Sequence, residues 1–162
     1  MNITRFTDYA LRVLIYLGVN DQELITIKDA AERYGISKNH LMKVVQELSA
    51  KGYVEAIRGK NGGIRLNRPP QEIRIGELVR GFEQDSTLVE CFGANNQCVI
   101  TPACMLKPMF AEAMNQFFLY LEKFTLADLL KGSGKTKLDQ ILGSSIISTS
   151  VKSADEINLD LK

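Results

Sequence analysis

The fold is decided by one stretch of the sequence, Thr26-Ile27-Lys28-Asp29-Ala30-Ala31-Glu32-Arg33-Tyr34-Gly35-Ile36-Ser37-Lys38-Asn39-His40-Leu41. Thr26 and Asp29 have the spacing of a capping box, which predicts that a helix begins after Thr26. Gly35 supplies a sharp turn that a residue with a Cβ resists, and Ser37 is suited to cap a second helix. Two helices joined by a short glycine turn predict a helix-turn-helix.

The second of these helices has the composition of a DNA-recognition helix. Its apolar residues recur at helical spacing and predict a buried stripe of Leu41, Val44, Val45 and Leu48. The exposed N-terminal end of such a helix enters the major groove, where lysine suits guanine acceptors or phosphates and asparagine suits adenine. The residues predicted to contact DNA from this helix are Ser37, Lys38, Asn39, His40 and Lys43.

A short β-hairpin is predicted directly after the recognition helix. Residues 53–57 and 64–66 alternate as strands do, and Asn61-Gly62 between them is a strong hairpin signal. A basic, glycine-rich tip behind a helix-turn-helix is typical of a wing, whose glycines let the backbone approach DNA while its basic side chains reach phosphates or a narrow minor groove. An ordinary surface hairpin is the alternative. The wing residues predicted to contact DNA are Arg58, Lys60, Asn61, Gly62 and Gly63.

The net charge of +1 over 162 residues conceals an asymmetry along the chain. Residues 1–70 carry +4 and residues 71–162 carry −3, and residues 37–68 alone hold seven basic against two acidic side chains. A basic stretch inside a neutral protein favours a phosphate-rich partner. The average composition excludes wholesale disorder and a disulfide-dense miniprotein. Because no membrane-spanning run and no secretory signal is visible, we expect a cytoplasmic protein without a membrane partner.

The predicted architecture is mainly α-helical, with a small β-hairpin wing and a long dimerisation helix. Helices are predicted at 7–17 and 75–82, and apolar residues continue at helical spacing from 106 to 124. This last stripe is rich in Phe and Met, so it favours a dimer helix over the alternative of an intramolecular core helix. We expect a winged helix-turn-helix domain at 1–82, a cysteine loop at 83–105, the dimerisation helix at 106–131 and a flexible tail at 132–162.

The three cysteines, Cys91, Cys98 and Cys104, fall within 14 residues. An odd number in a reducing compartment argues against disulfides, and the absence of a Cys-x-x-Cys pair argues against a zinc ribbon or a thioredoxin site. Thiolates grouped in one loop suit an iron–sulfur cluster, which usually takes four ligands, so one iron requires a ligand other than cysteine. Zinc, a thiol redox switch and ordinary cysteines remain open alternatives.

Three motifs together resemble a known family. They are Thr4-Arg5-Phe6-Thr7-Asp8-Tyr9-Ala10-Leu11-Arg12, the wing Arg58-Gly59-Lys60-Asn61-Gly62-Gly63-Ile64-Arg65-Leu66, and the cysteine loop that ends in Pro102-Ala103-Cys104. Over roughly residues 1–130 the chain resembles the iron–sulfur cluster-binding winged-helix regulators. Gly59-Lys60-Asn61-Gly62-Gly63 and Thr125-Leu126-Ala127-Asp128-Leu129 point within that family to its nitric-oxide-sensing repressors.

The resemblance implies a metal site shared between two subunits of a homodimer. Three ligands would be Cys91, Cys98 and Cys104, and Asp8 of the partner subunit would be the fourth. Arg12, one helical turn after Asp8, would be the carboxylate's own partner. The histidine that follows the third cysteine in IscR-like members is missing, since Lys107 and Pro108 occupy that stretch. A 4Fe–4S cluster is favoured over 2Fe–2S, because three thiolates and one oxygen suit a cubane.

The resemblance also implies a function. The chain would be a repressor bound to double-stranded operator DNA until nitric oxide nitrosylates the irons, the bond to Asp8 is lost and the DNA-binding geometry relaxes. Alternatives are a regulator of the same family that senses iron–sulfur status or redox state, a redox protein that does not bind DNA, and a winged-helix adaptor with structural zinc. No enzymatic activity is expected, because the chain has one histidine and no Ser/His/Asp set or paired-carboxylate motif.

Overall fold

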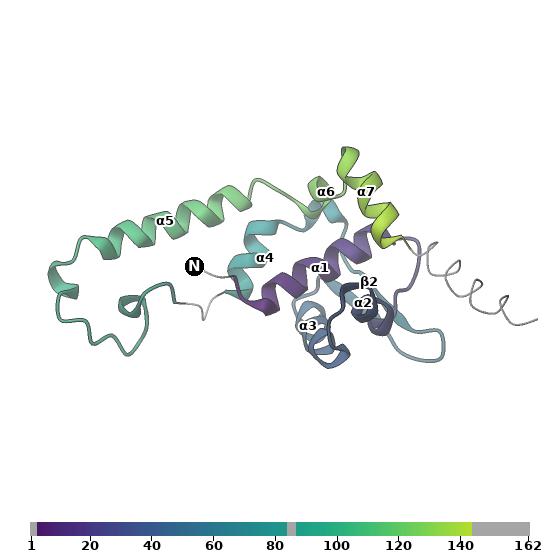
Figure 1. The fold of residues 1–162 in the computed structure, drawn as a ribbon, viewed down its shortest axis with the longest axis horizontal. Coiled ribbons are helices and arrows are strands. Elements are labelled where there is room, and N and C mark those ends of the chain that lie inside the picture. The colour runs from purple at the N-terminus through teal and green to yellow at the C-terminus, as the bar shows by residue number, and fades with distance from the viewer. Residues whose placement is uncertain (1–2, 84–86, 144–162) are drawn as a thin grey trace, which may run out of the picture.

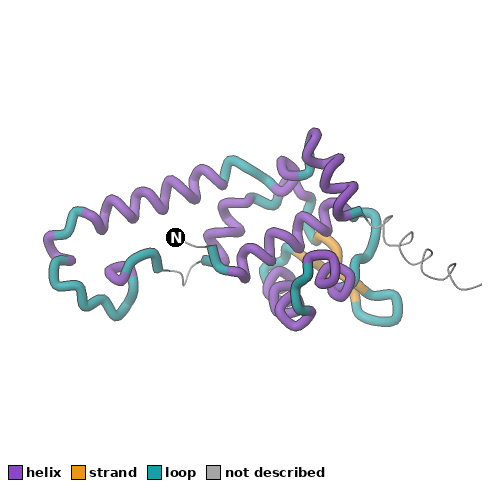
Figure 2. Tube along the Cα trace, viewed as in Figure 1, coloured by secondary structure: helices purple, strands orange, loops and turns teal. Residues whose placement is uncertain are grey.

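The computed structural model describes residues 3–83 and 87–143 of the chain. These residues form helices and one two-stranded antiparallel sheet (Figures 1 and 2), as expected for a mainly α-helical protein with a hairpin wing. The helices are α1 (Arg5–Val19), α2 (Ile27–Tyr34), α3 (Lys38–Ala50), α4 (Ile75–Phe82), α5 (Leu106–Leu121), α6 (Leu126–Leu129) and α7 (Gly132–Leu142). The strands are β1 (Val54–Ile57) and β2 (Gly63–Leu66), and short 3₁₀ turns lie at Pro70–Glu72, Glu90–Phe92 and Thr101–Ala103.

Helices α2 and α3 form the predicted helix-turn-helix, and both N-caps are made by the expected residues. The Thr26 side chain accepts a hydrogen bond from the Asp29 amide at 3.1 Å and donates one to its carboxylate at 2.6 Å. Gly35 turns the chain with φ +62°. The Ser37 hydroxyl then accepts from the His40 amide at 3.3 Å. Local hydrogen bonds and the left-handed Gly35 therefore define both ends of the turn.

The hairpin forms with Val54 opposite Leu66 and Ile57 opposite Gly63, but its turn differs from the expected one. The connection spans residues 58–62, and the positive φ within it belongs to Gly59 at +115° rather than to Asn61-Gly62. A five-residue loop that bends at Gly59 replaces the tight two-residue turn that Asn-Gly favours. Ile25 pairs with Ile64 through two backbone hydrogen bonds, which ties the wing to the segment before α2.

The C-terminal end of α5 is fixed to α4. The Ile75 amide donates to the Phe124 carbonyl at 2.9 Å, and the Leu126 amide donates to the Ile73 carbonyl at 2.8 Å. Gly76 allows α4 to approach closely, because a Cβ at this position would clash with backbone atoms of α5. Phe118 is the only buried residue of α5. The helix is therefore anchored at this end only.

The rest of α5 and the cysteine loop form an arm, which we define as residues 87–117. No residue of the arm is buried, whereas α1 and α3 each contribute at least four residues to the hydrophobic core. Figure 1 shows α5 leading away from the other helices and the loop lying below its far end. The helix ends at Leu121, shorter than the apolar pattern to residue 124 predicts.

The expectation of a flexible tail from residue 132 is wrong for its first part. Residues 132–142 form α7, which packs on α1. Leu142 is buried, and the Asn20 side chain donates to its carbonyl at 3.2 Å. Leu138, Ile141 and Leu142 stand at helical spacing only in the last turn and a half of a stretch that begins with Gly, Ser and Lys, so the apolar pattern is too short to predict the whole helix. Residues 144–162 lie outside the described part of the chain.

Candidate nucleic-acid interface and cysteine loop

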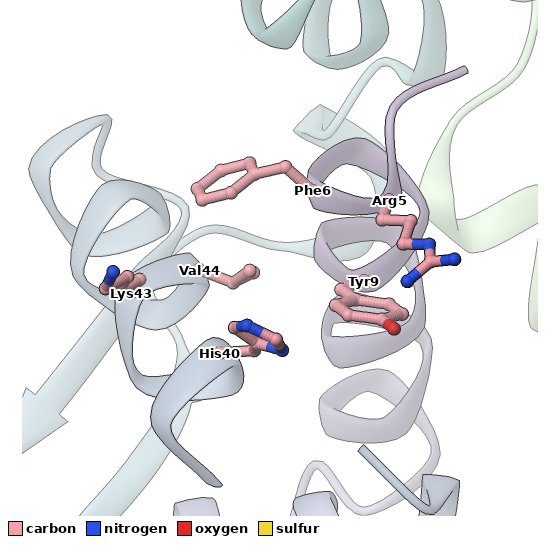
Figure 3. Close-up of a pocket in the computed structure, with 6 residues that line it drawn as sticks. All are labelled: Arg5, Phe6, Tyr9, His40, Lys43 and Val44. Carbon is pink, nitrogen blue, oxygen red and sulfur yellow. The ribbon is translucent and has the colours of Figure 1, made fainter. Parts of the chain in front are cut away.

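The recognition-helix residues predicted from the sequence all lie at the surface. Ser37, Lys38, Asn39, His40 and Lys43 are exposed, and the buried stripe of α3 is the predicted one. Ser37 serves as the N-cap through its hydroxyl. The side chain of His40 lies on the side of α3 that faces α1 (Figure 3). The remaining polar side chains are available to a ligand that approaches the N-terminal end of α3.

The basic stretch 37–68 keeps most of its positive charge available. Its two acidic residues are both engaged, because Glu47 pairs with Lys51 at 3.4 Å and Glu55 pairs with Arg65 at 2.8 Å. In the ranges 3–83 and 87–143, five exposed cations of this stretch take part in no ion pair: Lys38, Lys43, Arg58, Lys60 and Arg68. Arg68 instead donates hydrogen bonds to the carbonyls of Gly52 and Lys51. Cations without a protein partner are suited to DNA phosphates.

The two wing glycines have a structural reason that sequence reasoning did not identify. A Cβ at Gly62 would clash with the Ile57 carbonyl, and one at Gly63 would lie 2.9 Å from the Ile25 carbonyl. The hairpin's own packing therefore requires glycine at both positions, whatever the backbone does with DNA. Arg58, Lys60 and Asn61 are exposed around them.

Asp8 and Arg12 form a bidentate ion pair on α1. Arg12 Nε lies 3.0 Å from Asp8 Oδ1, and Arg12 Nη2 lies 2.8 Å from Oδ2, with both side chains 43% exposed. The guanidinium also lies 5.9 Å from the ring centroids of Tyr9 and Tyr34, a range that permits cation–π attraction. The pairing expected from the i, i+4 spacing is thus present, and it occupies both carboxylate oxygens.

Tyr34 connects this pair to the helix-turn-helix. It is the last residue of α2, and its hydroxyl donates to the Arg12 carbonyl at 3.0 Å. Burial raises the pKa of Tyr34 to about 12, against a smaller lowering by Arg12. The phenol is therefore neutral and a hydrogen-bond donor throughout the physiological range.

Glu83 is a contact that sequence reasoning missed. Its Oε1 accepts hydrogen bonds from the Thr4 amide at 2.9 Å, the Thr4 hydroxyl at 2.8 Å and the Thr7 hydroxyl at 2.5 Å. Phe82, beside it, contacts Phe6 with ring centroids 5.6 Å apart. The end of α4 therefore holds the N-terminus of α1. Nothing in the sequence signals this, because the partners lie more than 75 residues apart.

The cysteine loop has internal order, yet it does not gather its thiols. Asn96 Oδ1 accepts from the Cys98 amide at 3.1 Å, and the Thr101 hydroxyl donates to the Cys98 carbonyl at 2.8 Å. Cys91, Cys98 and Cys104 are all free and half-buried. Within the described residues, no three or more His, Cys, Asp or Glu side chains lie together as a metal ion requires. The structure thus does not bring the predicted ligands together, and Asp8 pairs with Arg12 instead.

The donor chemistry of the loop nonetheless fits an iron–sulfur cluster. Three free thiols on one segment are soft ligands of the type such clusters take, and none is consumed by a disulfide. The single histidine, His40, lies on α3, so the chain offers no nearby imidazole for the remaining position. A set of four ligands would therefore be completed by an oxygen or by another donor that is neither cysteine nor a nearby histidine.

A family comparison explains why a winged helix and a cysteine loop occur in one chain. Residues 3–132 match the family model named Rrf2, described as an iron-dependent transcriptional regulator. The chain belongs to the Rrf2 family. The match covers the winged helix, the arm and α6, so the α-helical fold and the cysteine loop belong to a single family unit.

Two curated relatives share more than half of their aligned residues with this chain. The chain is 52% identical over 132 residues to the transcriptional regulator NsrR of Bacillus licheniformis, covering 80% of this chain and 92% of the relative. It is 54% identical over 133 residues to NsrR of Bacillus subtilis, covering 81% and 91%. The chain is thus similar to regulators named NsrR over most of its length, which confirms the expected resemblance within the family.

Solved Rrf2-like structures show the same fold. Oxidized CymR of Staphylococcus aureus is 25% identical, with a TM-score of 0.65 over 82% of this chain and 98% of that one. IscR of T. potens is 19% identical, with a TM-score of 0.62 over 100% and 94%. The protein is a transcriptional regulator with a winged-helix fold. In the described ranges, no helix is long and apolar enough to cross a membrane.

Proposed function

We propose that this Rrf2 protein is a homodimeric repressor that senses nitric oxide through an iron–sulfur cluster and releases operator DNA when the cluster is nitrosylated. The observation that carries the proposal is the presence of three free, half-buried cysteines on the arm of a winged helix. The 52–54% identity to NsrR proteins favours nitric oxide as the signal.

The exposed apolar side of the arm supports the homodimer. Isolated hydrophobic residues at a surface are normal, but a contiguous patch marks an interaction site. The large exposed apolar residues of α5 and of the turn that follows it are Leu106, Met109, Phe110, Leu119, Tyr120 and Phe124. A second copy of α5 would bury side chains of this set, and a two-fold dimer suits a two-fold operator.

Cys91, Cys98 and Cys104 would hold the cluster, with Asp8 of the partner subunit as the fourth ligand. The cluster would supply irons that react with nitric oxide, and 4Fe–4S is favoured over 2Fe–2S. Each Asp8 oxygen accepts one bond from Arg12 and keeps a second lone pair with which it could bind iron. Arg12 is then the residue that holds the carboxylate when the bond to iron is lost.

The proposal for DNA binding rests on α3 and the wing. Ser37, Lys38, Asn39, His40 and Lys43 would meet the major groove, and Arg58, Lys60, Asn61, Gly62 and Gly63 would meet the adjacent backbone or minor groove. The four unpaired cations in these two sets support phosphate contacts.

The first experiment tests the cofactor. Protein purified without oxygen should show iron–sulfur absorption that nitric oxide bleaches, and Cys91→Ala, Cys98→Ala and Cys104→Ala should each abolish it. Far-ultraviolet circular dichroism should be unchanged, because none of these cysteines belongs to the hydrophobic core. Retention of the full absorption by any of the three variants would show that the ligand assignment is wrong.

The second experiment tests the link between subunits. Asp8→Ala should keep a cluster and lose most of the effect of nitric oxide on binding to a DNA duplex selected from a random pool by the loaded protein. Asp21→Ala removes an exposed carboxylate after the other end of α1 and should behave as the wild type. An unchanged nitric oxide response in Asp8→Ala would refute the cross-subunit ligand.

A second candidate is favoured by the family description as iron-dependent. In this version the same cysteines report iron–sulfur status or redox state. Iron depletion without nitric oxide would then release DNA as completely as nitric oxide does. Comparing the two treatments on the same DNA duplex separates the candidates.

A further inference from the structure

The tip of the cysteine loop presents two aliphatic side chains to solvent. Val99 is 91% exposed and Ile100 is 59% exposed, directly after Cys98. Burial of both side chains would be favourable, because it removes apolar surface from water. They lie on the arm rather than against the body, so the chain itself offers them no cover.

A pocket between α1 and α3 has a floor suited to such side chains. It has a volume of about 300 Å³ and is lined by Arg5, Phe6, Tyr9, His40, Lys43 and Val44. In Figure 3, Phe6 points from α1 towards α3, and His40 on α3 faces the ring of Tyr9. The floor is therefore aromatic and aliphatic, and the rim carries two cations.

The arm cannot fill the pocket of its own chain in this structure. Figure 1 shows the loop displaced from α3 along the longest dimension of the molecule, with α1 beginning between them. The exposure of Val99 leads to the same conclusion. An occupant from the loop must therefore come from a second copy.

We infer that Val99 and Ile100 of one subunit dock into the α1–α3 pocket of the other, an inference that rests on the proposed cross-subunit role of Asp8. Residues 5, 8 and 9 share one face of α1, because positions three and four apart are neighbours on a helix. A loop that brings Cys98 to Asp8 of the partner subunit therefore brings the next two residues to Arg5 and Tyr9 of the same α1.

Charge supports the same pairing. Residues 87–104 contain one acidic residue, Glu90, and no basic one. Arg5 and Lys43 at the rim are positive and exposed, and neither takes part in an ion pair within 3–83 and 87–143. Complementary charge fixes the register of such a contact more than its strength.

A docked loop would contact the recognition helix α3 directly. Three of the six lining residues, His40, Lys43 and Val44, belong to α3, and the other three belong to α1. A seated loop therefore biases how α3 lies against α1, which is the differential contact that a two-state regulator requires. Loss of the loop from the pocket removes that bias in the DNA-reading element itself.

Photocrosslinking tests the contact. We would replace Val99 with the photoreactive amino acid p-benzoylphenylalanine and mix the labelled subunit with an isotopically heavy, unlabelled one. Irradiation should join the probe at position 99 to heavy peptides that contain residues 5–9 or 40–44. The same substitution at Ile141, an exposed residue of α7, should give no such product. Crosslinks confined to the labelled subunit, or to other regions of the heavy one, would overturn the inference.

A second variant keeps the inference falsifiable if the bulky probe disturbs docking. Val99→Asp should keep cluster absorption and the dimer mass, and it should reduce the ratio of DNA affinities before and after nitric oxide by about tenfold. Ile141→Asp should leave that ratio unchanged. An unaltered ratio in Val99→Asp would overturn the docking.

These outcomes separate the docking from the proposed function. A wild-type protein that responds to nitric oxide but gives no Val99 crosslink to α1 or α3 overturns the docking alone. A protein that gives the crosslink but has no iron–sulfur absorption and no nitric oxide response overturns the sensor and leaves the docking as a subunit contact. Both measurements are made on the full chain.

Discussion

The winged-helix body and the arm use apolar residues in opposite ways. In the body, defined as residues 3–83, the apolar stripes of α1 and α3 face inward and supply nine of the buried residues of the hydrophobic core. The arm, residues 87–117, includes most of α5, in which apolar side chains are at least as frequent as in α1 and α3. No residue of the arm is buried. The body therefore buries its apolar stripes within its own chain. The arm carries a sequence whose burial requires something outside the chain.

The largest expected effect compares a leucine from each region. Leu14→Ala removes a fully buried side chain of α1 and should lower the free energy of unfolding by about 2–5 kcal/mol. Leu106→Ala removes an exposed side chain of the arm and should change it by less than about 0.5 kcal/mol in the monomer. Urea titration at low protein concentration measures both. Equal losses would contradict the contrast between the regions.

The next effect concerns self-association. Met109 is 63% exposed on α5, and Met109→Asp places a charge in the proposed dimer stripe. We expect self-association to weaken by on the order of 100-fold, the size of an interface hot spot, with helix content unchanged. Analytical ultracentrifugation over a concentration series measures it. Ile141→Asp, on an exposed face of α7, is the matched control, and equal weakening in the two variants would exclude α5 as the dimer helix.

The body could be predicted from the sequence because its signals are local. The capping pair Thr26–Asp29, the turn at Gly35 and the cap at Ser37 each act within a few residues, and each appears as expected. Strand alternation predicts the hairpin but not its turn: Asn61-Gly62 favours a two-residue turn, whereas the chain bends at Gly59. The packing of Gly63 against Ile25 is a tertiary constraint that the local sequence does not reveal. Helix α7 was missed because its stability comes from contact with α1.

The same distinction between local signals and tertiary contacts applies to the candidate site. The exposure of the five recognition-helix residues follows from helical periodicity, so it could be predicted. The three-bond contact of Glu83 with Thr4 and Thr7 could not, because it depends on how α4 packs beside α1. The arrangement of the cysteine thiols is likewise not set by their spacing, and in the single chain they stay apart.

A smaller effect tests whether Lys43 of the body contacts a DNA phosphate. Lys43 on α3 is without an ion-pair partner in the described ranges, whereas Lys51 pairs with Glu47 at 3.4 Å. Lys43→Ala should lower the slope of log affinity against log salt concentration by about one, because one phosphate contact is lost. Lys51→Ala should leave that slope nearly unchanged. Fluorescence anisotropy at several salt concentrations measures both, and equal slopes would remove Lys43 from the interface.

The smallest expected effect concerns the start of α6, the short helix that follows α5. At the start of α6, the Asp128 carboxylate accepts from the Thr125 amide at 2.8 Å and the Thr125 hydroxyl at 2.7 Å, and Lys131 lies 3.0 Å away. These hydrogen bonds, the backbone one first, lower the pKa of Asp128 from 3.8 to about 2. Because the folded-state pKa is the lower one, this group stabilises the fold above about pH 4, and the contribution is lost as the pH falls through 2.

Asp128→Asn removes that titration and isolates it from the rest of the acid response. The variant should be less stable than the wild type at neutral pH and should approach it as the pH falls from 4 to 2, because protonation takes the same contribution from the wild type. Urea titrations at closely spaced pH values measure the difference. Asp139→Asn, an exposed carboxylate of α7, should show no such convergence. A constant gap for Asp128→Asn would mean that the carboxylate charge does not stabilise this junction, and that its cap acts through shape and hydrogen-bond geometry alone.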